Sequence, residues 1–184
     1  VRYIWQQEDA TAYTMWQLLE PQSETIRTGL AEMFGVDREE IAITRNASES
    51  LEILLMGMDF KRGDEVLTTT QDYPRMLTTL HQREKREGLV LKMVKIPIPP
   101  KNLDEITAAF EKGITSRTKL ILVSHQVNIR GQITPVKAIC DLARARGIET
   151  IVDGAHSYAQ FDFKQKDLGC DYFGTSLHKW LYAP

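Results

Sequence analysis

Short apolar runs alternate with longer amphipathic stretches along most of this chain. The apolar runs predict strands at 41–44, 66–70, 89–96, 119–125, 149–153 and 171–176. Between them, apolar residues recur at every third or fourth position, which predicts helices over 46–58, from Pro74 onward, over 102–114 and over 135–147. Strands that alternate with helices of this length predict an α/β fold of three layers, α/β/α, in which helices cover both faces of a mainly parallel sheet.

The two ends of the chain have a different character. Residues 1–21 are rich in aromatic side chains: Tyr3, Trp5, Tyr13 and Trp16. A helix is predicted after Pro21, and Gly35 is its natural end. We predict an N-terminal segment over 1–21, which either covers a subunit interface or packs on its own domain, and a large domain over 22–184. Because the chain begins with Val1 and stops within a predicted loop, we expect a longer protein with a further C-terminal domain.

Composition and charge narrow the class of protein. The 184 residues are 42% hydrophobic and 26% charged, which is ordinary for one globular domain. The formal net charge of -2 gives no sign of the basic surface that binds nucleic acid or an anionic membrane. No run reaches the ~18 apolar residues of a helix that spans a membrane. Cys140 and Cys170 fall at core positions and form no disulfide framework, so we expect a cytoplasmic protein, with export left open if a signal precedes Val1.

Polar residues gather directly after the predicted strands. They form five groups: Asn46–Ser48, Thr70–Tyr73, His125–Asn128, Asp153–His156 and Ser176–Lys179. Because the carboxyl ends of parallel strands meet at one edge of a sheet, and ligands of α/β sheets bind there, these groups are the candidate site.

The stretch TRNASESLE at 44–52 places small polar residues where a strand turns into a helix. One interpretation is capping of the helix, since Asn46 is followed three residues later by Glu49, as in a capping box. The other interpretation is a phosphate site, because backbone N–H groups and the helix dipole at such an N-terminus attract anions. The stretch taken alone leaves both open.

Two further groups suggest a cofactor. Asp153 ends a buried strand, where it is either a turn former or a partner for a cationic ring nitrogen. Lys179 lies between His178 and Trp180 after another buried strand, and a desolvated lysine near a second cation has a lowered pKa and becomes nucleophilic. A phosphate site, an acid for a pyridine nitrogen and a lysine for a Schiff base are the groups that pyridoxal phosphate requires.

Four motifs, in the same order, resemble the class V aminotransferase family of fold-type I pyridoxal-phosphate enzymes. The motifs are TRNASES, NIRGQITP, VDGAHS and SLHKWLYAP, within 22–184. The family includes cysteine desulfurases and isopenicillin-N-epimerase-like proteins. The resemblance implies that 22–184 is the large domain of a pyridoxal-phosphate-dependent transferase.

The resemblance also implies roles for individual residues. Lys179 would form the Schiff base with the cofactor, and Asp153 would hold its pyridine nitrogen protonated. Ser176 and His178 would bind the phosphate from one side and Ala47 and Ser48 from the other. His156 and Asn128 would lie near the ring hydroxyl.

One position departs from the family pattern. A histidine of the family often stacks on the cofactor ring shortly after the strand that ends near Thr70, but here the sequence reads TTTQDYPRM. Alignment places Gln71 nearest to the position of that histidine, while Tyr73 is our prediction for the residue that stacks on the ring. His81 falls within a predicted helix, outside the site, and His125 is expected to order the loop that carries Asn128.

The resemblance implies a reaction class. The substrate would be a small amino acid that forms an external aldimine and then an α-carbanion, with Asp153 and Lys179 as the catalytic residues. Amino transfer is our first reading; cysteine desulfuration or lysis and epimerisation are alternatives. A catalytically silent homologue that serves as an interaction module also stays open. The resemblance implies a homodimer and no metal.

Overall fold

A computed structural model describes residues 11–183, which divide into two compact units at Ile43 and Thr44. Tyr3 and Trp5 lie outside the described residues. The predicted boundary after residue 21 concerns the domains of a longer protein and stays a prediction. Among the described residues, no helix combines the length and the hydropathy needed to cross a membrane.

The first unit is helical. It contains α2 (Thr11–Tyr13), a π-helical turn η1 (Thr14–Leu19), α3 (Glu20–Phe34) and a short 3-10 helix η2 (Arg38–Glu40). Pro21 falls in the first turn of α3, which follows η1 directly. Gly35 ends the helix with φ of 76°, and its N–H binds the carbonyl of Ala31. The predicted end of this helix is therefore confirmed.

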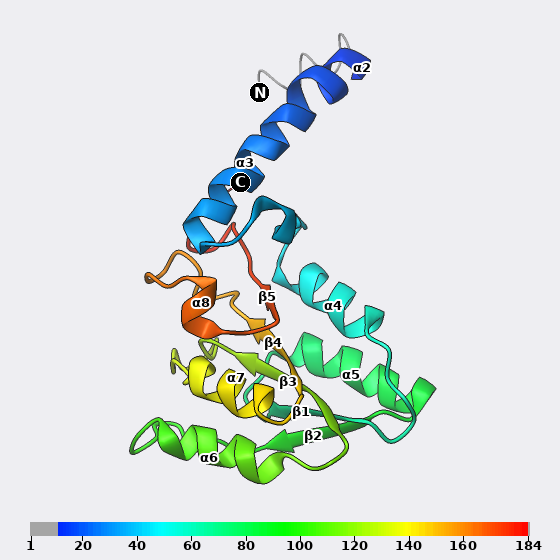
Figure 1. The fold of residues 1–184 in the computed structure, drawn as a ribbon, viewed down its shortest axis with the longest axis vertical. Helices are drawn as coiled ribbons and strands as arrows, with labels where there is room; N and C mark the ends of the chain where they lie inside the picture. The colour runs from blue at the N-terminus through cyan, green and yellow to red at the C-terminus, as the bar shows by residue number, and fades with distance from the viewer. Residues whose placement is uncertain (1–10, 184) are drawn as a thin grey trace. The chain divides into compact units, whose positions relative to one another are not determined.

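The second unit contains a parallel sheet of five strands, which confirms the predicted sheet (Figure 1). The strands are β1 (Glu65–Thr69), β2 (Val90–Val94), β3 (Thr118–Ser124), β4 (Glu149–Asp153) and β5 (Tyr172–Gly174), in the order β2-β1-β3-β4-β5. The predicted strand at 41–44 is wrong: this segment pairs with no described strand, and the Ile43 side chain is 48% exposed. A short apolar run without a neighbouring strand to complete its hydrogen bonds does not become a strand.

Helices cover both faces of the sheet, as predicted. Figure 1 shows α4 (Ala47–Gly57) and α5 (Pro74–Glu87) on one face. The other face carries α6 (Asp104–Gly113), α7 (Val136–Arg144) and the short α8 (Gln165–Leu168). Because side chains alternate along a strand, Leu120 and Leu122 of β3 join the core under α4 and α5, and the intervening Ile121 is buried on the opposite side.

The strand order reverses between β1 and β3. The chain leaves β1 through α5 to reach β2 on one side, whereas β3, β4 and β5 follow on the other side. Helices that depart in opposite directions from two neighbouring strands leave a crevice at their carboxyl ends, where α/β proteins bind ligands. The second unit therefore places its candidate site at this edge.

Two glycines allow close packing beneath the crevice. A Cβ atom on Gly174 of β5 would lie 2.8 Å from side-chain atoms of Leu51, so α4 packs directly on this strand. A Cβ atom on Gly154, directly after β4, would lie 1.9 Å from the ring of Phe173. Bulkier residues at either position would push α4 or the β4 turn away from the strand ends.

We expect Gly154→Ala to lower the free energy of unfolding by about 1–3 kcal/mol, because the Phe173 ring must move to admit the methyl group. Gly57→Ala is the matched control, since no atom lies within 4 Å of its added Cβ in α4, and we expect it to be neutral or stabilising by up to ~1 kcal/mol. Urea unfolding of both variants measures the difference. Equal stability of the two would contradict this account of the packing.

Candidate active site

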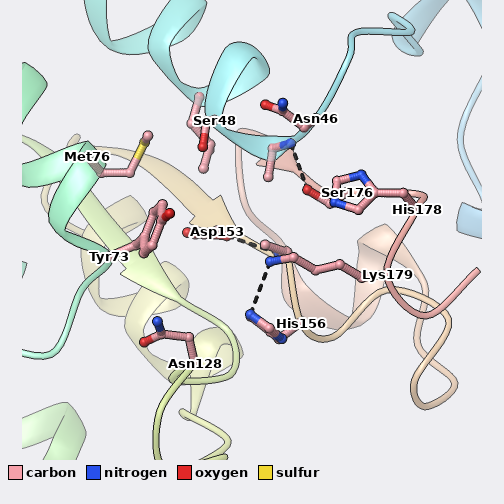
Figure 2. Close-up of a pocket in the computed structure, with 13 residues that line it drawn as sticks. Asn46, Ser48, Tyr73, Met76, Asn128, Asp153, His156, Ser176, His178 and Lys179 are labelled. Carbon is pink, nitrogen blue, oxygen red and sulfur yellow. Dashed lines mark hydrogen bonds between the residues drawn. The ribbon is translucent and has the colours of Figure 1, made fainter.

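A cavity of about 390 Å³ lies at the carboxyl ends of the strands in the second unit. Its wall includes all nine residues that the sequence predicts for the site: Ala47, Ser48, Tyr73, Asn128, Asp153, His156, Ser176, His178 and Lys179. Asn46, Leu51, Met76 and Ala155 complete the wall. Figure 2 shows these side chains converging from α4, from the start of α5 and from the segments after β3, β4 and β5. The fold therefore gathers residues far apart in sequence around one volume.

The N-terminus of α4 opens into the cavity. The Asn46 side chain accepts a hydrogen bond from the Glu49 N–H at 3.0 Å, which confirms the predicted cap. The second half of the predicted capping box is wrong, because the Glu49 carboxylate accepts from the Arg45 N–H, at 2.6 Å, instead of from Asn46. The Ala47 N–H donates to Ser176 Oγ at 2.9 Å, which ties α4 to the segment after β5. The Ser48 N–H has no acceptor in the described part of the chain and is free for an anion.

Lys179 and His156 form a direct pair, with 3.0 Å between Lys179 Nζ and His156 Nε2 (Figure 2). Burial lowers the pKa of Lys179, although the charge of Asp153 opposes this effect. Burial, followed by the charge of Lys179, lowers the pKa of His156. Both shifts favour neutral forms, so the imidazole is available as an acceptor and the amine loses its proton more readily than a solvated lysine.

Asp153 ends β4 as a buried carboxylate that is 8% exposed. Its Oδ1 atom accepts the Ala155 N–H at 2.9 Å, and Oδ2 has no donor among residues 11–183. Burial raises the pKa of Asp153 to about 6; the charge of Asp72 adds to the rise, and the Ala155 hydrogen bond and the charge of Lys179 oppose it. A desolvated acid with an open oxygen at a cavity is suited to a ligand that brings an N–H donor.

A short hairpin holds Asn128 in the cavity wall. Gln126 and Ile133 form an isolated antiparallel bridge, and the Gly131 N–H binds the carbonyl of Val127 at 2.8 Å. Gly131 has φ of 67°, a conformation that glycine adopts without strain. Asn128 lies inside this hairpin and faces the cavity.

His125 lies at the base of the same hairpin, outside the cavity wall. Its ring packs edge-on against Phe161 and Phe163, and burial lowers its pKa to about 4. Its backbone N–H donates to the carbonyl of Asp153, and its carbonyl accepts from the Thr134 N–H. These bonds tie the hairpin to β4, in agreement with the expected ordering role.

The start of α5 supplies Tyr73, one of the two residues that the sequence offered for the stacking position. Tyr73 is the N-cap of α5 and lines the cavity, whereas Gln71 does not. His81 is exposed and bonded to Glu84, away from the cavity. Met76, three residues after Tyr73, forms an apolar wall that sequence reasoning assigned only to the helix core. Its helical spacing from Tyr73 was the available signal.

The two cysteines are core residues, as predicted. Cys140 lies on α7 and Cys170 lies before β5, and both are buried. Burial raises the pKa of Cys140 to about 11 and that of Cys170 to about 12. Neither thiol lines the cavity.

A model of the family described as aminotransferase class-V matches residues 7–184. The chain belongs to this family. Its relatives include isopenicillin N epimerase from Streptomyces clavuligerus, 34% identical over 86% of this chain and 40% of the relative, and a probable cysteine desulfurase from Pseudomonas aeruginosa, 33% identical over 79% of this chain and 36% of the relative. The chain therefore spans about 40% of the length of the curated relatives it matches. The resemblance drawn from the four motifs is confirmed.

Solved structures of the family share this fold. A C-DES mutant, with glycine covalently linked to its PLP cofactor, superposes with a TM-score of 0.87 at 26% identity over 99% of this chain and 48% of that one. The apo cysteine desulfurase from Thermococcus onnurineus NA1 gives a TM-score of 0.80 at 32% identity over 88% of this chain and 40% of that one. The predicted fold class is confirmed.

Replacing Asp153 by Asn should remove a pH-dependent penalty on folding. The pKa of Asp153 rises from 3.8 to about 6 in the folded protein, so the folded state binds this proton more tightly than the unfolded chain. The stability from this protonation is complete below about pH 4 and is lost as the pH rises through about 6. In urea unfolding of the ligand-free protein, we expect Asp153→Asn to gain up to ~3 kcal/mol over wild type between pH 4 and pH 8, at about 1.4 kcal/mol per pKa unit.

Asn keeps the acceptor for the Ala155 N–H, so the comparison isolates the charge. Asp59→Asn is the control, because Asp59 is exposed and the change should stay within about 0.5 kcal/mol at both pH values. If Asp153→Asn and wild type lose stability in parallel between pH 4 and pH 8, Asp153 does not carry the penalty.

Proposed function

We propose that this chain forms the cofactor-binding part of a pyridoxal-phosphate enzyme that acts at the α-carbon of an amino acid. One observation carries the proposal: the Lys179 amine, the Asp153 carboxylate and the N-terminus of α4 face the same cavity. An amine for a carbonyl, an acid for a pyridine nitrogen and a helix N-terminus for a phosphate are the three attachments that this cofactor needs.

The donor set of the cavity fits pyridoxal phosphate. The unpaired Ser48 N–H, the Ser176 hydroxyl and His178 would hold the phosphate, which the dipole of α4 also favours. The open Oδ2 of Asp153 would accept the ring N–H, and this bond would remove the penalty of a buried, unpaired carboxylate. The Tyr73 ring would face the cofactor ring, and His156 and Asn128 would contact its hydroxyl group.

When bound, pyridoxal phosphate supplies an aldehyde that condenses with amines and a ring that accepts electrons from the α-carbon. Lys179 must be neutral to act as the amine, and its lowered pKa makes this form more available than in a solvated lysine. With substrate bound, the Lys179 amine would take a proton from the α-carbon and return it. His156, at 3.0 Å, can accept the proton that Lys179 releases.

Asp153 acts on the ring through its charge. A carboxylate at a dry strand end interacts more strongly with a cationic N–H than an exposed one does, because little solvent screens the pair. The Ala155 N–H fixes the carboxylate by holding Oδ1 and leaves Oδ2 for the ring.

The step after proton removal decides between amino transfer, epimerisation and desulfuration or lysis. Relatives of this chain include isopenicillin N epimerases and cysteine desulfurases, and a solved neighbour is a cystine C-S lyase in complex with cysteine persulfide. The described residues supply the shared early steps. The residues that distinguish these outcomes would come from the part of the relatives that this chain does not span. Our proposal is the class V aminotransferase-like reaction, with the other two as branches.

We also propose a homodimer and a cytoplasmic location. Exposed Tyr13 and Trp16 of the first unit are apolar residues that a second subunit would cover. The two free cysteines accord with a reducing compartment.

Lys179→Ala should abolish the absorption band that pyridoxal phosphate acquires on binding, because no Schiff base with the protein can form. We expect wild type to show a band at the edge of the visible range, and borohydride to fix the label on the peptide that contains Lys179. Lys166→Ala is the control, because this exposed lysine lies outside the cavity, and it should leave the band unchanged.

A wild-type protein that stays colourless after incubation with pyridoxal phosphate would contradict the proposal. That result would favour the alternative of a silent homologue that keeps the fold as an interaction module.

A further inference from the structure

Asp72 is a buried acid that the sequence analysis left without a role. It lies three residues after the end of β1, is 5% exposed, and directly precedes Tyr73. Its Oδ2 atom accepts hydrogen bonds from the Thr69 N–H at 2.9 Å, from the Thr69 hydroxyl at 3.0 Å and from the Thr68 hydroxyl. Its Oδ1 atom accepts from the Ser124 N–H at 3.1 Å and the Ser124 hydroxyl at 2.6 Å.

These bonds span the point where the strand order reverses. Thr68 and Thr69 end β1, and Ser124 ends β3, the neighbouring strand on the other side of the crevice. Asp72 therefore closes the gap between two strand ends from which the chain departs in opposite directions. Two of the five groups are backbone N–H groups, one on each oxygen, and because an N–H can only donate, both oxygens of Asp72 act as acceptors.

No Lys, Arg or His of the described residues pairs with Asp72. Glu65, at the opposite end of β1, provides the contrast. It is equally buried, but Arg117 bonds to it at 2.8 Å and Lys92 lies 3.6 Å away. Hydrogen bonds satisfy the oxygens of Asp72 without cancelling its charge, so this negative charge also acts on groups that Asp72 does not contact.

Asp153 is one of the groups on which the charge of Asp72 acts. In the sheet, Asp153 is the register partner of Ser124, whose N–H and hydroxyl both bind Asp72. The negative charge of Asp72 is one of the two causes that raise the pKa of Asp153, after burial. Asp72 therefore binds the end of β3, and Asp153 ends the next strand and lines the cavity.

We propose that Asp72 is a positioning residue of the site: its carboxylate locks the turn that carries Tyr73 to the ends of β1 and β3, and its charge acts on Asp153 across the end of β3. The role toward a bound ring rests on the proposed function. With a pyridine nitrogen at Asp153, the charge of Asp72 favours the protonated ring, because a second negative charge stabilises the cation.

Several other titratable groups lie at the same ends of the strands and must be held constant. Lys179 and His178 follow β5, His156 follows β4, His125 follows β3, and Tyr73 begins α5. The first experiment therefore compares variants that leave these groups unchanged and uses the full-length protein stripped of cofactor. Carboxyl carbons of labelled Asp are followed by NMR as the pH rises, and Asp153→Asn identifies the Asp153 signal.

We expect Asp72→Asn to lower the titration midpoint of Asp153 by about one pH unit, because the neighbouring negative charge is lost. Ser124→Ala is the matched control: it removes one hydroxyl donor but leaves the charge of Asp72, so the midpoint should stay within a few tenths of a unit. An unmoved midpoint in folded Asp72→Asn would overturn the proposal. An equal downward shift in both variants would also overturn it, since a purely structural role would affect both.

Asp72→Glu tests the proposal even if Asp72→Asn does not fold. It keeps the negative charge, so the Asp153 midpoint should stay within a few tenths of a unit of wild type, and a fall of about one pH unit in folded Asp72→Glu would overturn the proposal. None of these measurements involves a bound cofactor, so they stand whether or not the protein takes pyridoxal phosphate.

A second experiment addresses the bound ring. Pyridoxal phosphate labelled with ¹⁵N in the ring is added to wild type, Asp72→Asn and Ser124→Ala. We expect the ring nitrogen to lose its proton at a lower pH in Asp72→Asn than in the other two. Equal midpoints in all three would overturn the electrostatic role. A failure of wild type to bind the labelled cofactor would overturn the proposed function, and the titration of Asp153 would still decide the role of Asp72.

Discussion

The desolvation of Asp153 is the constraint on which the site depends. The carboxylate ends a buried strand between β3 and β5, and among the residues that the structure describes only one of its oxygens has a donor. Burial of this kind is costly, and its cost is recovered only when a ligand brings a cation or an N–H group. The same burial lowers the pKa of Lys179. Desolvation at this edge of the sheet therefore shifts the pKa values of both the acid and the amine. The two groups oppose each other's shifts, which keeps either from moving as far as burial alone would take it.

The geometry of that edge depends on contacts between distant parts of the chain. The Ala47 N–H bonds to Ser176 Oγ across 129 residues of sequence, and Gly174 lets Leu51 pack directly on β5. These contacts hold the positive end of α4 against the segment that carries Lys179. A helix N-terminus and a nucleophilic amine are therefore fixed at one cavity by packing, before any ligand is present.

Sequence reasoning located the site because its signals are local. Each strand of the sheet contains a short apolar run, and polar residues lie at or shortly after its end, so the parallel arrangement brings Asp153, Asn128 and Lys179 to one edge. It failed where the outcome depends on partners elsewhere. The run at 41–44 has the composition of a strand but lacks a neighbour, and Glu49 has the spacing of a capping box but binds Arg45. The role of Asp72 was not predicted, because its donors come from two strands about 55 residues apart and the stretch TTTQDYPRM does not indicate a contact with Ser124.

The two buried acids near the ends of β1, Glu65 and Asp72, differ in whether a cation pairs with them. Burial alone would raise the pKa of Glu65, but hydrogen bonds from Thr115 and Arg117 and the charges of Lys92 and Arg117 hold it below its usual value. At that edge the protein neutralises its own charge, and no ligand is required. At the other edge, within residues 11–183, Asp72 has donors but no paired cation, and Asp153 has one donor and an open oxygen. The two acids favour a cation beside them, and the positive end of α4 favours an anion, so the cavity suits a ligand that carries a cationic ring nitrogen at one end and an anion at the other.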